Sequence, residues 1–159
     1  PSIGPRLERK KVQLSREKIF AQMEEILAHW NSKQVLEVQY ENEVGFGLGP
    51  TLEAYALLSK EFQNSNLNLW RNSTDGLFPA PLARNATKNV VHRLRTKFHF
   101  LGKFLGKALL DCRMVDLPFN LLFYRWMLNE EEFLQFEHLR HLDRPLFEQL
   151  KKFRRILQR

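Results

Sequence analysis

The sequence has very little cysteine, because Cys112 is the only one among 159 residues. One cysteine excludes a disulfide within the chain and is typical of proteins from reducing compartments. No stretch approaches the roughly 20 consecutive apolar residues of a membrane-spanning helix. The opening residues PSIGPRLERKK contain no apolar stretch after their basic residues, so no secretory signal is expected. We therefore expect an intracellular protein of the nucleus, the cytoplasm or both, without membrane contact.

The sequence also lacks a self-contained active site. No serine stands in the G-x-S-x-G pattern of a nucleophile elbow, and no acidic pair stands out as a general acid and base. His138 and His141 could share one helical face, with Glu137 and Asp143 nearby. Metal ligation there would need a third convergent ligand, so histidines on a surface turn are the preferred interpretation. We predict no catalytic, cofactor-binding or metal-binding residue in this chain, and no cofactor.

Glycines alternate at Gly45, Gly47 and Gly49 within VQYENEVGFGLGPTLEAYALLSKEF, residues 38–62. The dinucleotide-binding pattern G-x-G-x-x-G is not met, because the third glycine comes one residue early. The Gly-Lys-Ser/Thr of a nucleotide-binding P-loop is missing as well, and two glutamates before the glycines would repel phosphate. The run is therefore predicted to be a turn between a strand and a helix, with Pro50 in the first helical turn.

The pattern of apolar residues predicts an α+β fold that is mostly α-helical, with one domain over residues 12–159. Residues 1–11 are expected to be a flexible lead, and residues 63–89 a long polar loop. Helical spacing and strand alternation predict the following elements: a helix capped by Ser15 and ending before Asn31, a strand at 35–40, and helices at about 51–62, 90–112, 117–128 and from Pro145 onward.

The helix at 90–112 carries the clearest apolar face. Its predicted members recur three and four residues apart: Val91, Leu94, Phe98, Leu101, Leu105, Ala108 and Cys112. Gly102 and Gly106 stand four apart on one side, which predicts the close approach of another backbone. Cys112, at the end of the face, is expected to be a buried small apolar residue and not a reactive thiol.

The chain is basic, with a formal net charge of +7. Arg93, Lys97, Lys103 and Lys107 form a cationic surface on the same helix, and its aromatic residues are expected to be committed to the core. A solvated face is the preferred interpretation, and nucleic-acid binding is not expected. The alternative function is a noncatalytic basic helical module that binds nucleic acid or an acidic partner.

Two longer segments carry a resemblance to a known family. Residues 36–62, LEVQYENEVGFGLGPTLEAYALLSKEF, resemble the opening signature of the HECT ubiquitin ligase domain, in which a strand, an acidic and glycine-rich turn and a helix ending in LSKE recur. Residues 98–128, FHFLGKFLGKALLDCRMVDLPFNLLFYRWML, are similar to its second signature. The residue sequences GLGPTLE and LLDCRMVDLPF are most similar to those of the ubiquitin-fusion-degradation branch and its thyroid-receptor-interactor relatives. The resemblance covers about Arg9 to Arg159.

The resemblance implies a fragment of the large N-terminal lobe of a HECT domain. In that family a subdomain of this lobe binds the ubiquitin-conjugating enzyme, and a cysteine of the C-terminal lobe accepts ubiquitin as a thioester and passes it to substrate lysines. Neither is expected in this sequence, and Cys112 aligns with a structural helix. The chain is thus expected to be a scaffold of a ubiquitin transferase that works with ubiquitin, a conjugating enzyme and protein substrates. Some members bind ubiquitin noncovalently near the 63–89 loop, where Trp70 and Phe78 lie.

Overall fold

The computed structural model describes residues 8–71 and 73–158. These residues form two compact units, and each is described by itself. The first unit runs up to Asn64 and resumes over residues 86–116, and the second comprises residues 65–85 and the chain from Leu117 onward. The fold is α+β and mostly helical, as the apolar pattern predicts.

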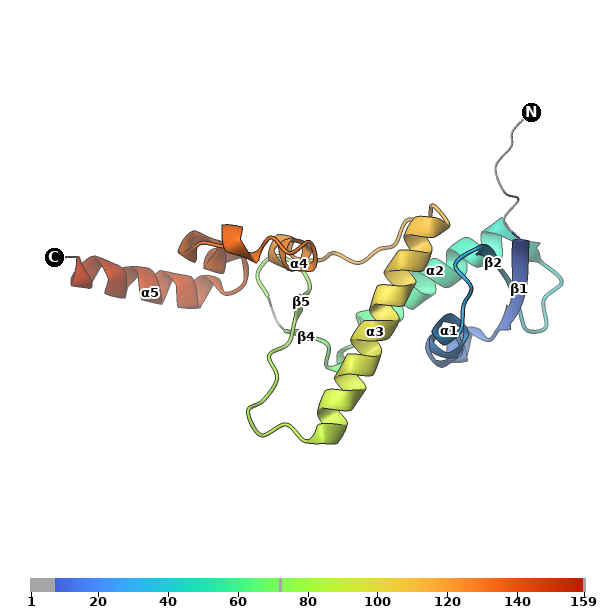
Figure 1. Ribbon diagram of the computed structural model, residues 1–159, viewed down its shortest axis with the longest axis horizontal. Helices are drawn as coiled ribbons and strands as arrows, with labels where there is room; N and C mark the ends of the chain where they lie inside the picture. Colours follow the sequence, from blue (N-terminus) through green and yellow to red (C-terminus); the bar gives the residue numbers. More distant parts are fainter. Residues whose placement is uncertain (1–7, 72, 159) are drawn as a thin grey trace, which may run out of the picture. The chain divides into compact units, whose positions relative to one another are not determined.

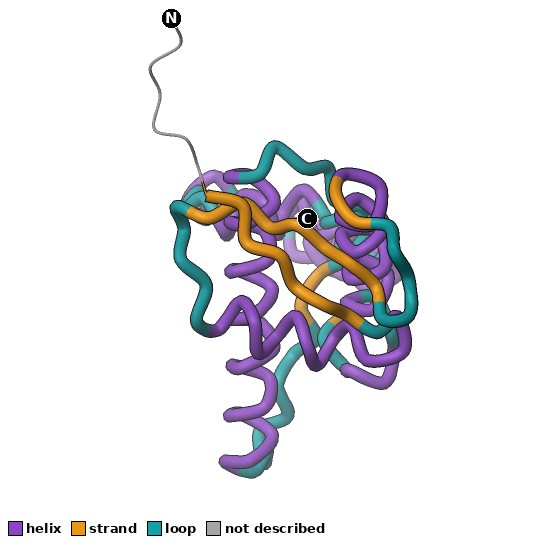
Figure 2. The backbone as a smooth tube through the Cα atoms, turned by 90° about the vertical axis from the view of Figure 1, so that its right-hand side faces the viewer, coloured by secondary structure: helices purple, strands orange, loops and turns teal. Residues whose placement is uncertain are grey.

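A three-stranded sheet forms one side of the first unit. Strand β1 (Glu8–Leu14) runs parallel to β2 (Gln34–Tyr40), and the short β3 (Phe46–Gly47) pairs antiparallel with β2, which is therefore the central strand (Figure 2). A short 3₁₀ turn and helix α1 (Ile19–Ala28) connect the two parallel strands, so β1–α1–β2 is a crossover unit. Ser15 precedes the turn but makes no capping bond with its side chain, contrary to the prediction.

The prediction of a flexible lead over residues 1–11 is wrong for residues 8–11. Residues 8–11 belong to strand β1, whereas residues 1–7 lie outside the described part of the chain. The segment ERKKVQL shows little apolar alternation because β1 is an edge strand with mostly exposed, charged side chains, a composition that protects sheet edges. Its pairing with β2 is a long-range contact that local patterns do not reveal.

Two longer helices complete the first unit. Helix α2 (Leu48–Phe62) packs on β2 and β3, and α3 (Lys88–Leu110) packs on α1 (Figure 1, with α3 in yellow). Pro50 lies in the first turn of α2, as predicted. The buried face of α2 includes Tyr55, Leu58 and Phe62, whereas Leu52 is 45% exposed.

The buried face of α3 matches the predicted one only in part, because Leu101 and Ala108 are buried as predicted but the other predicted members are not. The buried residues of α3 are Phe100, Leu101, Phe104, Lys107 and Ala108. Phe100 and Phe104 lie at its centre, because their rings contact Phe62 at centroid distances of 4.9 and 5.6 Å. Gly102 and Gly106 do not provide a close backbone approach, since a Cβ at either would meet no described atom within 4 Å.

The second unit holds a small hairpin, two helices and three 3₁₀ segments, the first of which is η2 (Ser65–Leu67). Strands β4 (Trp70–Arg71) and β5 (Phe78–Pro79) pair within the region expected to be a loop. Helix α4 (Leu121–Met127) is followed by η3 (Glu131–Phe133), η4 (Phe136–His141) and α5 (Arg144–Leu157). The predicted start of α4 was too early: Asn120 caps it, since its Oδ1 accepts a bond from the N–H of Leu122 at 2.9 Å.

Candidate functional site

Between β2 and α2 two positions have a positive φ, Asn42 at +62° and Gly47 in the glycine turn. Gly47 has φ of +104° and caps α2, whereas Gly45 and Gly49 have no positive φ. The hydroxyl of Thr51 donates to the carbonyl of Gly47 at 2.6 Å and accepts from the N–H of Val38 at 2.9 Å. Thr51 is fully buried, so this hydroxyl fastens the turn to the central strand. The predicted order of strand, turn and helix is confirmed.

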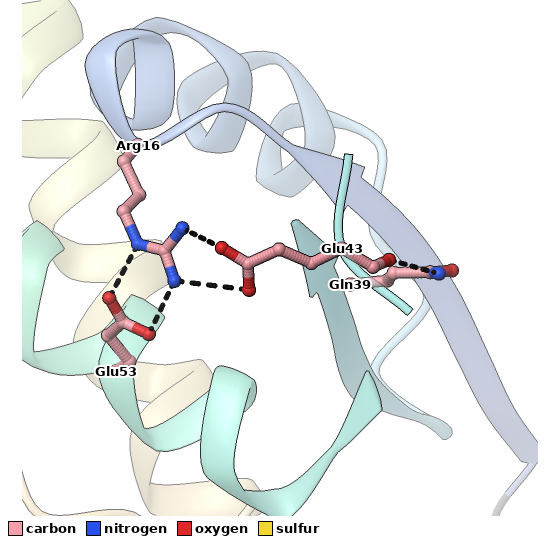
Figure 3. Close-up of polar contacts among 4 residues, drawn as sticks. All are labelled: Arg16, Gln39, Glu43 and Glu53. Carbon is pink, nitrogen blue, oxygen red and sulfur yellow. Dashed lines mark hydrogen bonds and ion pairs between the residues drawn. The ribbon is translucent and has the colours of Figure 1, made fainter. Parts of the chain in front are cut away.

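Arg16 holds the acidic part of the same turn against α2 (Figure 3). Its Nε and Nη2 donate to the two carboxylate oxygens of Glu53 at 2.7 and 3.1 Å, and its Nη1 and Nη2 donate to Glu43. The guanidinium also lies 3.8 Å from the ring centroid of Tyr40. Bidentate pairing of this kind fixes geometry, and it brings together residues 37 positions apart.

These contacts shift the titration of the groups involved. The hydrogen bonds from Arg16 hold the pKa of Glu53 below its ordinary value, and the bonds to Glu53 and Glu43 raise the pKa of Arg16. Burial, followed by the charge of Glu53, raises the pKa of Tyr40 to about 12. The shifts of Arg16 and Glu53 both favour their charged forms, which stabilises the ion pair between them.

A buried ion pair ties the end of α3 to the rest of the first unit. Lys107 donates to Asp111 Oδ1 at 2.5 Å and to the carbonyl of Gln34 at 2.6 Å, and the two side chains are 4% and 2% exposed. Tyr55 of α2 donates to Asp111 Oδ2 at 2.8 Å, and burial together with this bond raises the pKa of the Tyr55 phenol well above its usual range. The prediction that Lys107 belongs to a solvated cationic surface is therefore wrong, because its side chain is part of the core.

Cys112 is exposed, so the prediction that it is buried is wrong. Helix α3 ends at Leu110, and Cys112 follows with φ of +52°. The N–H of Arg113 bonds to the carbonyl of Ala108 at 2.8 Å, and that of Cys112 to Leu109 at 3.2 Å, which is the Schellman pattern of a helix C-terminus. The thiol therefore leaves the apolar face just where the chain turns away from the helix.

The other cations predicted on α3 are also largely engaged. Lys97 pairs with Glu24 at 2.5 Å, and Lys103 donates to the carbonyl of Ala28 at 2.7 Å. Of the four side chains, only that of Arg93 makes no hydrogen bond or ion pair within the described part of the chain. Cations already used within the fold are less available to phosphates, which weighs against the nucleic-acid alternative.

The two histidines considered as metal ligands have different partners. His138 Nδ1 accepts from the N–H of Gln135 at 2.8 Å, and His141 Nδ1 lies 2.5 Å from Asp75 Oδ2. Asp143 caps α5 through a bond from the N–H of Leu146 at 3.0 Å. Among the described residues no three His, Cys, Asp or Glu side chains converge as metal ligands would. The interpretation as turn histidines fits these contacts better.

Trp70 and Phe78 belong to an aromatic cluster of the second unit. The Trp70 ring lies 5.7 Å from Phe119 and 5.9 Å from Phe123, and Phe78 lies 6.2 Å from Phe123. Both residues are half-buried, so much of each ring is used in packing. A ubiquitin contact by either ring stays a prediction.

The sequence analysis did not identify two sets of contacts, the Arg16 lock (Arg16 with Glu43 and Glu53) and the Lys107 lock (Lys107 with Asp111). Lys107 and Asp111 have the helical i, i+4 spacing of an ion pair, and this was the available signal. No local signal links Arg16 to Glu53, because the two residues meet only after β1 has paired with β2 through the α1 crossover.

The described helices include none with the length and apolar character that a bilayer span requires.

Comparison with known proteins assigns the chain to a family. A family model described as the HECT domain (ubiquitin-transferase) matches residues 56–159. Since this is well over half of the chain, the chain belongs to the HECT-domain family. The segment at residues 98–128 lies wholly within the matched region, whereas the segment at residues 36–62 begins before it and overlaps its start.

The relatives belong to the branch that the sequence indicated. The chain is 39% identical over 161 residues to E3 ubiquitin-protein ligase TRIP12 of Danio rerio, covering 89% of this chain and 8% of that protein. It is 38% identical over 137 residues to ubiquitin fusion degradation protein 4 of Saccharomyces cerevisiae, covering 75% and 9%. E3 ubiquitin-protein ligase UPL3 of Arabidopsis thaliana is 33% identical over 187 residues, covering 97% and 10%. The chain thus spans only a small part of these relatives.

Proposed function

We propose that this chain is a scaffold portion of a HECT-type E3 ubiquitin-protein ligase, within the large N-terminal lobe of the domain. The match of the HECT model to residues 56–159 carries the proposal, and relatives named as E3 ubiquitin-protein ligases support it. We propose that this portion covers residues 12–159, and the pairing of β1 with β2 supports including the chain from Glu8 onward. The parent protein is a ubiquitin transferase, and this part supplies structure instead of the reacting thiol.

The surroundings of Cys112 support a noncatalytic role. Reactive thiolates form at helix N-termini or beside cations, where positive charge favours them. Cys112 instead follows the C-terminal end of α3, where backbone carbonyls present partial negative charge. No catalytic, cofactor-binding or metal-binding residue is proposed for this chain.

The partners follow from the same proposal. The full domain would receive ubiquitin from a conjugating enzyme and transfer it, through a thioester on another cysteine, to lysines of protein substrates. A thiolate suits this task because it is a strong nucleophile and a good leaving group. We place the protein in the nucleus, the cytoplasm or both, since ubiquitin transfer takes place there.

A chimera tests the proposal. The matching segment of ubiquitin fusion degradation protein 4, about a tenth of that protein, is replaced by this chain, and ubiquitin transfer is followed with purified activating and conjugating enzymes. We expect transfer at a rate within about tenfold of the unmodified relative, roughly 1.4 kcal/mol in activation free energy. A chimera with the same thermal unfolding as the relative but no transfer would contradict the proposal.

A further inference from the structure

A groove of about 640 Å³ lies in the second unit between η4 and α5. One face of α5 lines it, formed by residues three and four apart from Arg144 to Gln158, and η4 and the turn at Thr74 and Asp75 form the rest. The apolar stripe of α5, with Leu150 and Phe153, lies outside this lining and on a different face of the helix. All the residues that line the groove belong to the second unit.

Two aromatic rings, Phe136 and Phe147, form the floor of the groove, and a cationic side chain lies over each of them. The rings of Phe136 and Phe147 lie 5.1 Å apart, and Phe147 is 7% exposed. Arg154 lies over the Phe136 ring at 5.4 Å, and Lys151 over the Phe147 ring at 5.5 Å. These contacts position cationic side chains along an apolar base, and the 7% exposure of Phe147 leaves little of that ring for stacking on a nucleic-acid base.

The walls carry more positive charge than their carboxylates balance. Two of the three carboxylates have partners, because Asp75 contacts His141 and Glu137 pairs with Arg154 at 3.3 Å. Four other cations line the groove, and within the described residues none has a carboxylate within the 4 Å of an ion pair: Arg140, Arg144, Lys151 and Arg155. Glu148 is the one lining carboxylate that has no cation partner among the described residues.

We propose that this groove docks an acidic segment of a partner protein, whose Asp and Glu side chains pair with Arg140, Arg144 and Arg155. Guanidinium groups bind carboxylates through two parallel hydrogen bonds, and complementary charge favours the right partner and speeds its association. Nucleic acid fits less well, because the buried Phe147 ring offers little surface on which a base could stack. The interaction is beyond ubiquitin transfer and does not depend on it.

A peptide-binding measurement tests this docking surface. The probe is a fluorescein-labelled peptide of about twelve residues that repeats Glu-Glu-Leu, long enough in extended form to span the groove. The reference peptide has glutamine in place of glutamate. Fluorescence anisotropy at about 0.15 M salt should show binding of the acidic peptide to the chain at least about tenfold tighter than that of the reference peptide.

Matched variants locate the binding. Arg144→Glu combined with Arg155→Glu should weaken the acidic peptide at least about tenfold, whereas Arg93→Glu combined with Arg95→Glu, the same charge change on α3, should leave it within about twofold. Glu148→Gln should strengthen binding, because it removes the unpaired carboxylate from the wall. If the charge-reversed groove variant fails to fold by circular dichroism, Arg144→Gln with Arg155→Gln replaces it and should also weaken binding.

Three results would each overturn the proposal. The first is equal binding of the glutamate and glutamine peptides. The second is an equal loss of affinity in the groove variant and the α3 variant, which would indicate general charge attraction. The third is tighter binding of a single-stranded oligonucleotide of the same net charge than of the acidic peptide.

Discussion

The Arg16 guanidinium binds both carboxylate oxygens of Glu53, at 2.7 and 3.1 Å, and so joins the 3₁₀ turn after β1 to the second turn of α2. Because these bonds hold the pKa of Glu53 low, the pair stabilises the fold above the ordinary glutamate pKa of about 4.3. This contribution is lost as the pH falls through the lowered folded-state pKa, where Glu53 takes up a proton.

Arg16→Gln should therefore return the pKa of Glu53 to its ordinary value. It should also remove stability at neutral pH but little at a pH below the folded-state pKa, where the pair is already lost. An NMR titration of the Glu53 carboxyl group measures the first effect, and urea unfolding at the two pH values measures the second. Arg9→Gln is the control, since Arg9 contacts Glu37 and not Glu53. An unchanged Glu53 titration in Arg16→Gln would contradict the account of this lock.

Gly47→Val should destabilise the first unit by about 1–3 kcal/mol, because a β-branched residue is strained at φ of +104°. Gly45→Val is the matched control, since Gly45 has no positive φ and no described atom lies within 4 Å of its Cβ position. Urea denaturation compares the two. Equal stability of both variants would show that the turn does not need a glycine at Gly47.

Lys107→Met should destabilise the first unit by about 3–5 kcal/mol, because it leaves the buried carboxylate of Asp111 without its cation. Lys103→Met, on the same helix and less buried, should cost less than about 1 kcal/mol by the same measurement. The double variant Lys107→Met with Asp111→Leu should recover much of the loss, since no charge then remains buried. A double variant no more stable than Lys107→Met would contradict the buried ion pair as the cause.

Cys112→Gly should stabilise the first unit by about 0.5–1 kcal/mol, because glycine adopts the left-handed conformation of a Schellman terminus without strain. Cys112→Ala keeps a Cβ and should change stability little. Thermal unfolding of the two variants separates the backbone effect from loss of the thiol. Destabilisation by Cys112→Gly but not by Cys112→Ala would contradict a Schellman terminus of α3 with residue 112 at positive φ.

Local sequence patterns predicted the elements whose signals lie within the element. The run from Val38 to Phe62 contains its own strand, turn and helix signals, and α5 carries its own amphipathic period, so both were located to within a few residues. The family followed from the same segments. These features depend on neighbours in sequence and not on the rest of the fold.

The features that were missed depend on distant contacts. Strand β1 needs β2 beside it, and its charged residues conceal it. The buried face of α3 centres on Phe100 and Phe104 because rings from α1 and α2 reach them: Phe20, Tyr55 and Phe62. The exposure of Cys112 depends on where α3 ends, and helix boundaries are poorly defined by period alone.

The location of the ubiquitin thioester tests the scaffold account most directly. The chimera with ubiquitin fusion degradation protein 4 is mixed with ubiquitin-charged conjugating enzyme and separated on a nonreducing gel, with and without Cys112→Ala. The account predicts a reducible ubiquitin adduct of equal intensity in both proteins, because the acceptor is a cysteine of the relative's own part. An adduct that disappears with Cys112→Ala would show that Cys112 accepts ubiquitin and would contradict a noncatalytic scaffold.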